Sequence, residues 1–208
     1  MISVMFVLLS YLIGSVSFAV VVSRLMRLPD PRTYGSNNPG ATNVLRSGNK
    51  KAAILTLLGD AAKGWAAVML AKYFAPQFGL GEPVIAAVAL AALVGHMYPV
   101  FHAFKGGKGV ATAIGIVFAV QTGLAFGVLL IWLPVFYFSR MVSLASVCAA
   151  AVAPLLGVNY FGFGWMALAL SIMALLIIYR HRENIAKLLA GTESRFGSAK
   201  DAQNNQGR

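Results

Sequence analysis

The fold depends on one apolar stretch, residues 109–139, which reads GVATAIGIVFAVQTGLAFGVLLIWLPVFYFS. A helix needs about 20 apolar residues to cross the hydrocarbon core of a bilayer, so this stretch is too long for one comfortable span and short for two. Similar apolar segments occupy most of the remaining chain. With two spans inside 109–139, the segments lie near 2–23, 52–74, 83–103, 109–121, 123–139, 141–157 and 162–179.

The composition is that of a membrane protein. Of 208 residues, 59% are hydrophobic and 11% are charged, with a mean hydropathy of +0.75, whereas a soluble domain is about 45–50% apolar and about 25% charged. The first apolar segment has no basic residues before it, and Arg24 and Arg27 follow it. This layout favours a retained first helix over a cleaved signal peptide. We therefore predict an all-α, polytopic membrane protein.

The basic residues decide how often the stretch 109–139 crosses. If it contains two spans, all of the 17 Lys and Arg residues except Lys63 and Lys72 lie on one face of the membrane. A single span would move Arg140 and the basic C-terminus to the opposite face. The positive-inside rule therefore predicts seven transmembrane helices, with the N-terminus outside and the C-terminus in the cytoplasm. Residues 1–191 are expected to form a single integral-membrane domain, and residues 192–208 a polar, disordered cytoplasmic tail.

The first polar connection carries a group of small hydrogen-bonding residues. Between 34 and 46 the chain reads YGSNNPGATNVLR, in which glycines would let backbone N–H groups approach an anion and Arg46 could contact phosphate with two parallel hydrogen bonds. The same residue types dominate ordinary turns. On these residues alone, an ordinary turn-rich connector is the simpler interpretation.

The second polar connection, FKGGKGVAT from 104 to 112, points more directly to an anion. A glycine-rich loop that leads into a helix, here expected to begin near Val110, offers N–H groups at the helix N-terminus. The stretch is not a Walker A sequence, because His102 stands where the first glycine is required and no Ser or Thr follows Lys108. A positive-inside loop would explain the lysines but not the glycines.

Two further groups lie on the same predicted face. His181 and Asn184 are three residues apart, so they would share a helix face, and the histidine could accept a proton or bind phosphate. A solvated helix next to the membrane explains this pattern equally well. Arg140 and Ser143 form a weaker pair.

The second apolar segment contains two charged residues, Asp60 and Lys63, whose spacing lets them pair on one helix face. A structural ion pair is the leading interpretation, and a proton or ion path is the alternative. His96 and His102 have no Asp, Glu or Cys close in the sequence, so we expect no metal site, and His96 is interpreted as a hydrogen-bonded packing residue. Cys148 is the single cysteine, which excludes an intrachain disulfide.

Three motifs occur in order along the chain: GSNNPGATN at 35–43, GHMYPVF at 95–101 continuing into FKGGKGVAT, and NI at 184–185 continuing to GTE at 191–193. Together they resemble the PlsY family of bacterial acyl-phosphate:glycerol-3-phosphate acyltransferases. The resemblance extends from the first helix to about Glu193. The family has seven spans with its motifs on the cytoplasmic side, in agreement with the charge distribution.

The resemblance implies an enzyme that transfers a long-chain acyl group from acyl phosphate to the 1-hydroxyl of glycerol 3-phosphate. The products would be 1-acylglycerol 3-phosphate (lysophosphatidic acid) and phosphate, in phospholipid synthesis. The expected location is the bacterial cytoplasmic (inner) membrane, with a multi-pass chain and an active site that faces the cytoplasm. The expected partners are acyl phosphate, glycerol 3-phosphate, the lipid bilayer and the enzyme that forms acyl phosphate, but no nucleic acid. No cofactor is expected.

The family pattern also implies roles for individual residues. The phosphate of glycerol 3-phosphate is assigned to Arg46, Lys105, Ser143 and His181. Acyl phosphate is assigned to Ser36, Gly40, Thr42, Asn43, Gly106, Gly107, Lys108 and Gly109. Asn184, His181 and Ser36 are the expected catalytic residues, with Asn184 orienting the attacking hydroxyl or the carbonyl. The proton is expected to go to the acyl phosphate itself, and His181 is the alternative base.

Two other classes of protein remain as alternatives. A transporter for phosphate or organophosphates would place its anion-binding residues near the middle of the membrane and would usually show repeat symmetry. A non-enzymatic membrane subunit or lipid-binding scaffold would explain the basic face but not two glycine-rich loops.

Overall fold

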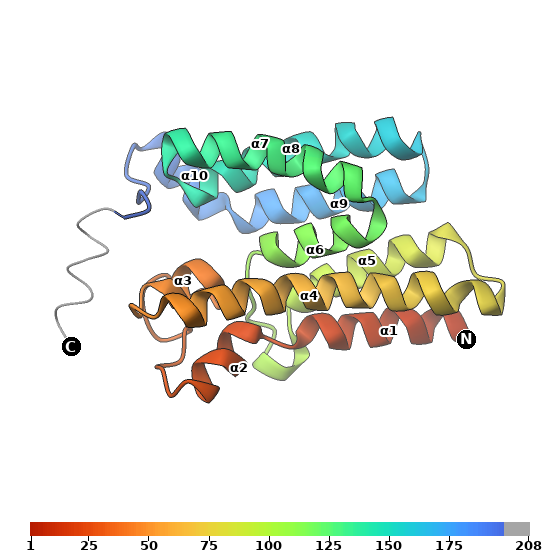
Figure 1. The fold of residues 1–208 in the computed structure, drawn as a ribbon, viewed down its shortest axis with the longest axis horizontal. Helices are drawn as coiled ribbons and strands as arrows, with labels where there is room; N and C mark the ends of the chain where they lie inside the picture. The colour runs from red at the N-terminus through yellow and green to blue at the C-terminus, as the bar shows by residue number, and fades with distance from the viewer. Residues whose placement is uncertain (198–208) are drawn as a thin grey trace. The chain divides into compact units, whose positions relative to one another are not determined.

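The structure, a computed structural model, describes residues 1–197. The chain forms two compact units, Met1–Val120 and the part from Gln121 onward, and every regular element within the described residues is helical (Figure 1). The all-α prediction is therefore confirmed for this part of the chain. Most of the predicted tail, residues 198–208, lies outside the described residues.

The first unit contains helices of very different lengths. In order along the chain they are α1 (Ile2–Ser15), α2 (Phe18–Leu25), α3 (Ala41–Leu45), α4 (Lys50–Phe74), η1 (Ala75–Phe78), α5 (Glu82–Met97), η2 (Val100–His102) and α6 (Val110–Val120). Helices α1 and α5 lie against each other and both contact α4, which also packs along α6 (Figure 1). The polar connections that carry the first two motifs, residues 26–49 and 98–109, both belong to this unit.

The second unit consists of α7 (Thr122–Ser139), α8 (Val142–Phe161), α9 (Trp165–Arg180) and α10 (Arg182–Leu189). Helix α8 packs against both α7 and α9, and the short α10 contacts the ends of α8 and α9. The stretch 109–139 is thus two helices, separated by Gln121 in an extended conformation. This division confirms the prediction of two helical segments, rather than one, within the stretch.

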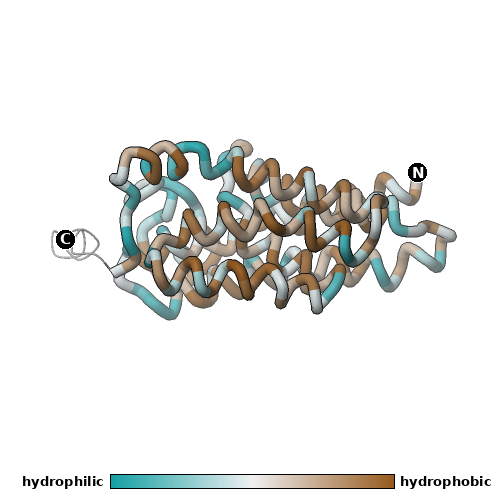
Figure 2. Tube along the Cα trace, turned by 90° about the horizontal axis from the view of Figure 1, so that it is seen from above, coloured by the Kyte–Doolittle hydropathy of each residue, from teal (hydrophilic) through white to brown (hydrophobic). Residues whose placement is uncertain are grey.

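Small residues bring the helices of the first unit close together. A side-chain Cβ at Gly14 would overlap the Ala92 carbonyl on α5, and one at Gly115 would overlap the Ala61 carbonyl on α4. Close backbone approach at small residues is typical of helices that pack inside membranes, where the lipid removes the hydrophobic drive for association. Hydrophobic residues line the lengths of the helices, and hydrophilic residues gather at the connections and helix ends (Figure 2).

The helices account for up to six of the seven predicted spans by length and composition. Four described segments are long and apolar enough to cross, namely Lys50–Phe78, Glu82–His102, Thr122–Ser139 and Val142–Phe161. Two bent pairs, α1 with α2 at 43° and α9 with α10 at 59°, could each be one span. Helix α6 has 11 residues and is about 16 Å long at 1.5 Å per residue, well short of the ~30 Å hydrocarbon core. The count of seven and the orientation of the termini stay predictions.

Candidate active site

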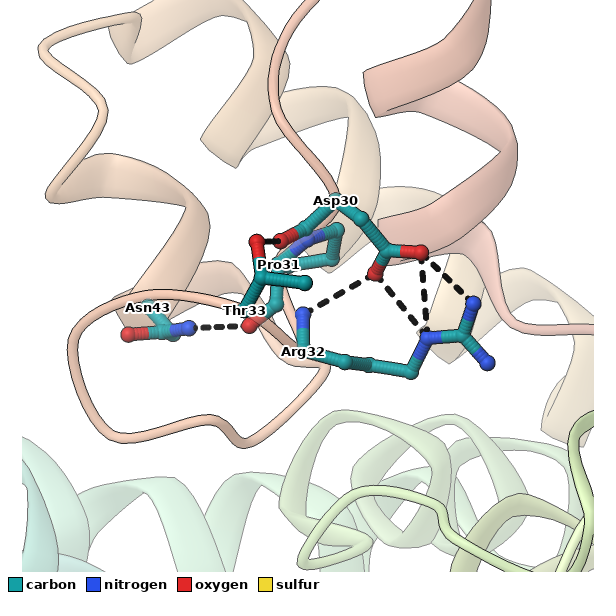
Figure 3. Close-up of polar contacts among 5 residues, drawn as sticks. All are labelled: Asp30, Pro31, Arg32, Thr33 and Asn43. Atoms are coloured by element: carbon teal, nitrogen blue, oxygen red, sulfur yellow. Dashed lines mark hydrogen bonds and ion pairs between the residues drawn. The ribbon is translucent and has the colours of Figure 1, made fainter.

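Asn43 organises the first polar connection from inside. Its side chain is buried, and its Nδ2 donates to the carbonyl of Pro31 at 2.6 Å (Figure 3). Nδ2 also donates to the carbonyl of Tyr34 at 3.1 Å, and Oδ1 accepts the Ser36 N–H at 2.9 Å. Both amide protons of Asn43 are therefore used within the loop. The sequence assigned Asn43 to acyl phosphate, but in this structure its side chain shapes the loop that presents Ser36.

An ion pair stabilises the start of the same loop. The Arg32 guanidinium donates to both carboxylate oxygens of Asp30, at 2.9 Å from Nε to Oδ1 and 2.6 Å from Nη2 to Oδ2 (Figure 3). The backbone N–H of Arg32 also donates to Asp30 at 3.0 Å. The hydrogen bond from the Arg32 side chain is the main reason that the pKa of Asp30 falls from 3.8 to about 2. Pro31, whose carbonyl accepts the hydrogen bond from Asn43, lies within this turn.

Arg46 lies beside the tight turn at Gly35. Gly35 has a left-handed backbone with φ +61°, and an added Cβ there would overlap Asn43 Oδ1 and lie 3.1 Å from Arg46 Cδ and 3.4 Å from its Nη1. Glycine at this position therefore leaves room for the Asn43 side chain and lets Arg46 lie close to the turn. Thr42, on the short helix α3, and Ser36 are both exposed. The structure brings Ser36, Asn43 and Arg46 together as the first motif predicted.

The glycine-rich loop 105–109 is held by the end of α5. The N–H groups of Gly106 and Gly107 donate to the carbonyls of Met97 and His96, each at 3.2 Å. These carbonyls need partners because the last turn of a helix leaves them without intrahelical donors. Both N–H groups were expected to contact acyl phosphate, but here they complete the end of α5. Gly40 likewise donates its N–H to Asn38 O at 2.9 Å.

The two loops meet at Gly107. A Cβ at Gly107 would overlap His96 Nε2 and would lie 3.2 Å from the carbonyl oxygen of Pro39 in the first loop. Lys105 is exposed and Lys108 is half-buried, and α6 begins at Val110 as predicted, directly after Gly109 with its φ of +87°. The first unit therefore gathers Arg46, two lysines and exposed hydroxyls from loops that touch each other.

In the second unit, the carboxylate of Glu193 joins two of the predicted residues. Glu193 Oε1 accepts from Ser143 Oγ at 2.6 Å and from Asn184 Nδ2 at 2.8 Å. Close by in the chain, the N–H of Phe196 donates to Arg140 O at 2.7 Å. A serine hydroxyl has one proton, so Ser143 can donate to a phosphate only after it releases Glu193. The sequence placed Glu193 in a motif but gave it no role.

His181 stands at the bend between α9 and α10. The residue is 3% exposed, and its Nδ1 lies 2.8 Å from the carbonyl oxygen of Ile177. A carbonyl can only accept, so Nδ1 carries a hydrogen, and in a neutral ring Nε2 is then an acceptor. This arrangement suits a proton acceptor at Nε2, whereas hydrogen bonding from Nε2 to phosphate would require the protonated ring.

The charged residues of α4 form a larger buried cluster than the sequence indicated. Lys63 Nζ lies 2.9 Å from Asp60 Oδ1, and the side chains of both are 3% exposed. The predicted ion pair is therefore confirmed. His96 Nδ1 lies 3.5 Å from the same Asp60 oxygen. The sequence did not indicate this contact, because Asp60 reaches His96 only through the packing of α4 against α5. Lys63 also donates to the carbonyl of Val16 at 2.6 Å.

Comparison with known proteins gives consistent matches over nearly the whole chain. The model of the family "Glycerol-3-phosphate acyltransferase" matches residues 4–191. A glycerol-3-phosphate acyltransferase of Ralstonia pickettii (strain 12J) is 61% identical over 96% of this chain and 97% of its own. One of Cupriavidus taiwanensis is 59% identical over 96% of this chain and 99% of its own.

Two solved structures are similar as well. The crystal structure of PlsY, an integral membrane glycerol 3-phosphate acyltransferase, in its glycerol 3-phosphate form has a TM-score of 0.87 and 42% identity, over 95% of this chain and 97% of that chain. The lysophosphatidic acid form has a TM-score of 0.84 and 41% identity, over 97% of this chain and 98% of that chain.

Proposed function

Because this multi-pass membrane protein belongs to the glycerol-3-phosphate acyltransferase family of PlsY, we propose that it acylates glycerol 3-phosphate with a long-chain acyl phosphate as donor. The products are lysophosphatidic acid and inorganic phosphate, which serve phospholipid synthesis. The observation that carries the proposal is the contact between the Arg46 loop and the glycine-rich loop at Gly107. Two neighbouring loops with fixed positive charge suit a reaction in which both substrates carry phosphate.

The proposed transfer needs little acid–base chemistry from the protein. The 1-hydroxyl oxygen of glycerol 3-phosphate forms a bond to the acyl carbonyl carbon, and the bond from that carbon to the phosphate oxygen breaks. The hydroxyl proton passes to the departing phosphate, which is already a good leaving group. Positioning and charge stabilisation are then the main contributions of the enzyme. His181, with Nε2 as an acceptor, is the alternative base.

We assign the phosphate of glycerol 3-phosphate to Arg46, Lys105, Ser143 and His181, the last with its ring protonated so that Nε2 can donate. Asn184 orients the reacting groups. For acyl phosphate we assign direct contacts to Ser36, Thr42, Lys108 and Gly109. Asn43, Gly40, Gly106 and Gly107 shape these loops, since the Asn43 side chain and the N–H groups of the three glycines already have acceptors within the first unit. Glu193 joins the set as the residue that holds Ser143 and Asn184.

We place the protein in the bacterial inner membrane, with seven spans, the N-terminus outside and the site facing the cytoplasm. The positive-inside rule supports this orientation. It can be tested with Lys51→Cys and Gln77→Cys, two exposed positions at opposite ends of Lys50–Phe78, after Cys148 has been replaced. An impermeant thiol reagent should label position 77 in intact cells and should spare position 51. Labelling of position 51 from outside would reverse the orientation.

The donor can be tested with purified protein, synthetic acyl phosphate and radiolabelled glycerol 3-phosphate. We expect labelled lysophosphatidic acid with acyl phosphate and none with acyl-CoA or acyl carrier protein thioester. Equal turnover with a thioester would overturn the donor assignment. The same protein in liposomes tests the alternative, because uptake of glycerol 3-phosphate without lipid product would identify a transporter.

A further inference from the structure

We propose that His96 positions the glycine-rich loop 105–109, and that the buried ion pair of Asp60 and Lys63 in turn fixes the orientation of His96. The loop carries Lys105 and Lys108, so the place of the imidazole determines where both lysines stand. What the loop binds rests on the proposed function, whereas how it is held rests on geometry alone.

The buried ion pair of Asp60 and Lys63 is held in a fixed position. Asp60 and Lys63 lie one helical turn apart on α4, inside a segment long enough to cross the membrane. Charges at such a depth are costly unless they are paired, so neither side chain can turn away without leaving its partner uncompensated. Lys63 is further fixed by the carbonyl of Val16, which lies where α1 breaks and α2 begins. A break in a helix leaves carbonyls that need a donor from elsewhere.

His96 joins the buried pair of Asp60 and Lys63 to the loop 105–109. One side of its ring faces Asp60, with Nδ1 at 3.5 Å from Oδ1. The other side faces Gly107, where even a methyl group would overlap Nε2 and Cε1. The carbonyl of the same residue accepts the N–H of Gly107 at 3.2 Å. The carbonyl and the ring of His96 both contact Gly107, and together they therefore fix the course of the loop backbone at this residue.

The contact reaches the first loop as well. Gly107 lies between the His96 ring and the carbonyl of Pro39. Pro39 is buried and Gly107 is buried, so neither can shift without moving its neighbour. A displaced imidazole would thus change the spacing of the two loops that carry Arg46 and Lys105. Misplacement of a binding group by about 1 Å can cost about 10²-fold in rate.

A pair of exchanges separates positioning from a general loss of folding. His96→Asn keeps an amide donor near Asp60 but empties the space beside Gly107, and because the loop carries residues assigned to both substrates we expect KM for glycerol 3-phosphate and for acyl phosphate to rise about tenfold while kcat changes less. Gly107→Ala should push the loop off the ring and lower kcat/KM by about 10²-fold. In His96→Asn/Gly107→Ala the shorter side chain makes room for the methyl group, so at least tenfold of the loss should return. Gly81→Ala, whose Cβ would meet only Pro83 at 3.8 Å, is the matched control.

Hydrogen–deuterium exchange of residues 105–109 gives a readout that needs no substrate. Exchange should be faster in His96→Asn than in wild type and should slow again in the double variant. If the wild-type protein fails to use acyl phosphate, the proposed function is wrong. The exchange measurement still tests the positioning role of His96, because it needs no substrate. If His96→Asn does not fold, His96→Gln, which reaches the Nε2 position, replaces it and should show a smaller change. Losses of kcat/KM that multiply in the double variant, or unchanged exchange of residues 105–109 in His96→Asn, would overturn the proposal.

Discussion

Removal of the Glu193 carboxylate should loosen the second unit in a graded way. Glu193 accepts hydrogen bonds from Ser143 and Asn184 through one oxygen. A hydrogen bond to a charged group contributes about 1.5–3 kcal/mol, and a neutral one about 0.5–1.5 kcal/mol. Glu193→Gln keeps an oxygen acceptor without the charge, so the loss is at most about 1 kcal/mol per bond, and because Glu193 is half-buried we expect about 1 kcal/mol in total.

Glu193→Ala removes both bonds, with an upper limit of about 3–6 kcal/mol. Glu193 is half-buried, so water replaces part of what is lost, and we expect about 2–3 kcal/mol. The assay is thermal unfolding in one detergent, followed by circular dichroism, together with kcat/KM on the same preparations. Glu183→Ala, an exposed carboxylate on α10, is the control. If Glu193→Ala unfolds at the control's temperature with the control's kcat/KM, the carboxylate does not hold Ser143 and Asn184.

Three further predictions concern the polar loops and the proton. Arg46→Ala and Lys105→Ala should each lower kcat/KM about ten- to hundredfold, since each removes a charge-assisted contact of about 1.5–3 kcal/mol, whereas the exposed Lys51→Ala should not. Because the pKa of Asp30 is lowered to about 2, the stability that its ion pair with Arg32 contributes is present above pH 3.8 and is lost as the pH falls through about 2. The ion pair is partly exposed, so Asp30→Asn should lower the free energy of unfolding by no more than about 1 kcal/mol at neutral pH. Thermal unfolding measured at a series of pH values checks both expectations. His181→Gln should raise KM for glycerol 3-phosphate and keep the acidic limb of the pH–rate profile; disappearance of that limb together with a collapse of kcat would make His181 the base.

The positions of the helices and the break at Gln121 followed from the sequence, but the bend inside the first predicted segment, 2–23, did not. Apolar length predicted the helices that became α4, α5, α7 and α8, and the glycines before Val110 predicted the start of α6. The bend after Ser15 has no proline to announce it. It depends on a lysine 47 positions away that satisfies the Val16 carbonyl, and such a pairing is visible only once α1 and α4 are packed together.

The candidate site was predictable in its residue types and less so in its contacts. Small polar side chains and glycines suggested donors for phosphate at Asn43, Gly106 and Gly107, because a sequence shows which groups can donate. It does not show which donors are already used, and the folded chain directs these N–H groups to the carbonyls of Pro31, Tyr34, Met97 and His96. A buried donor that already has an acceptor must lose that bond before it can bind a ligand. In the two loops of the first unit, the side chains best suited to meet substrate are therefore the exposed ones of Ser36, Thr42 and Lys105, and the buried Asn43, Gly106 and Gly107 set where those side chains stand.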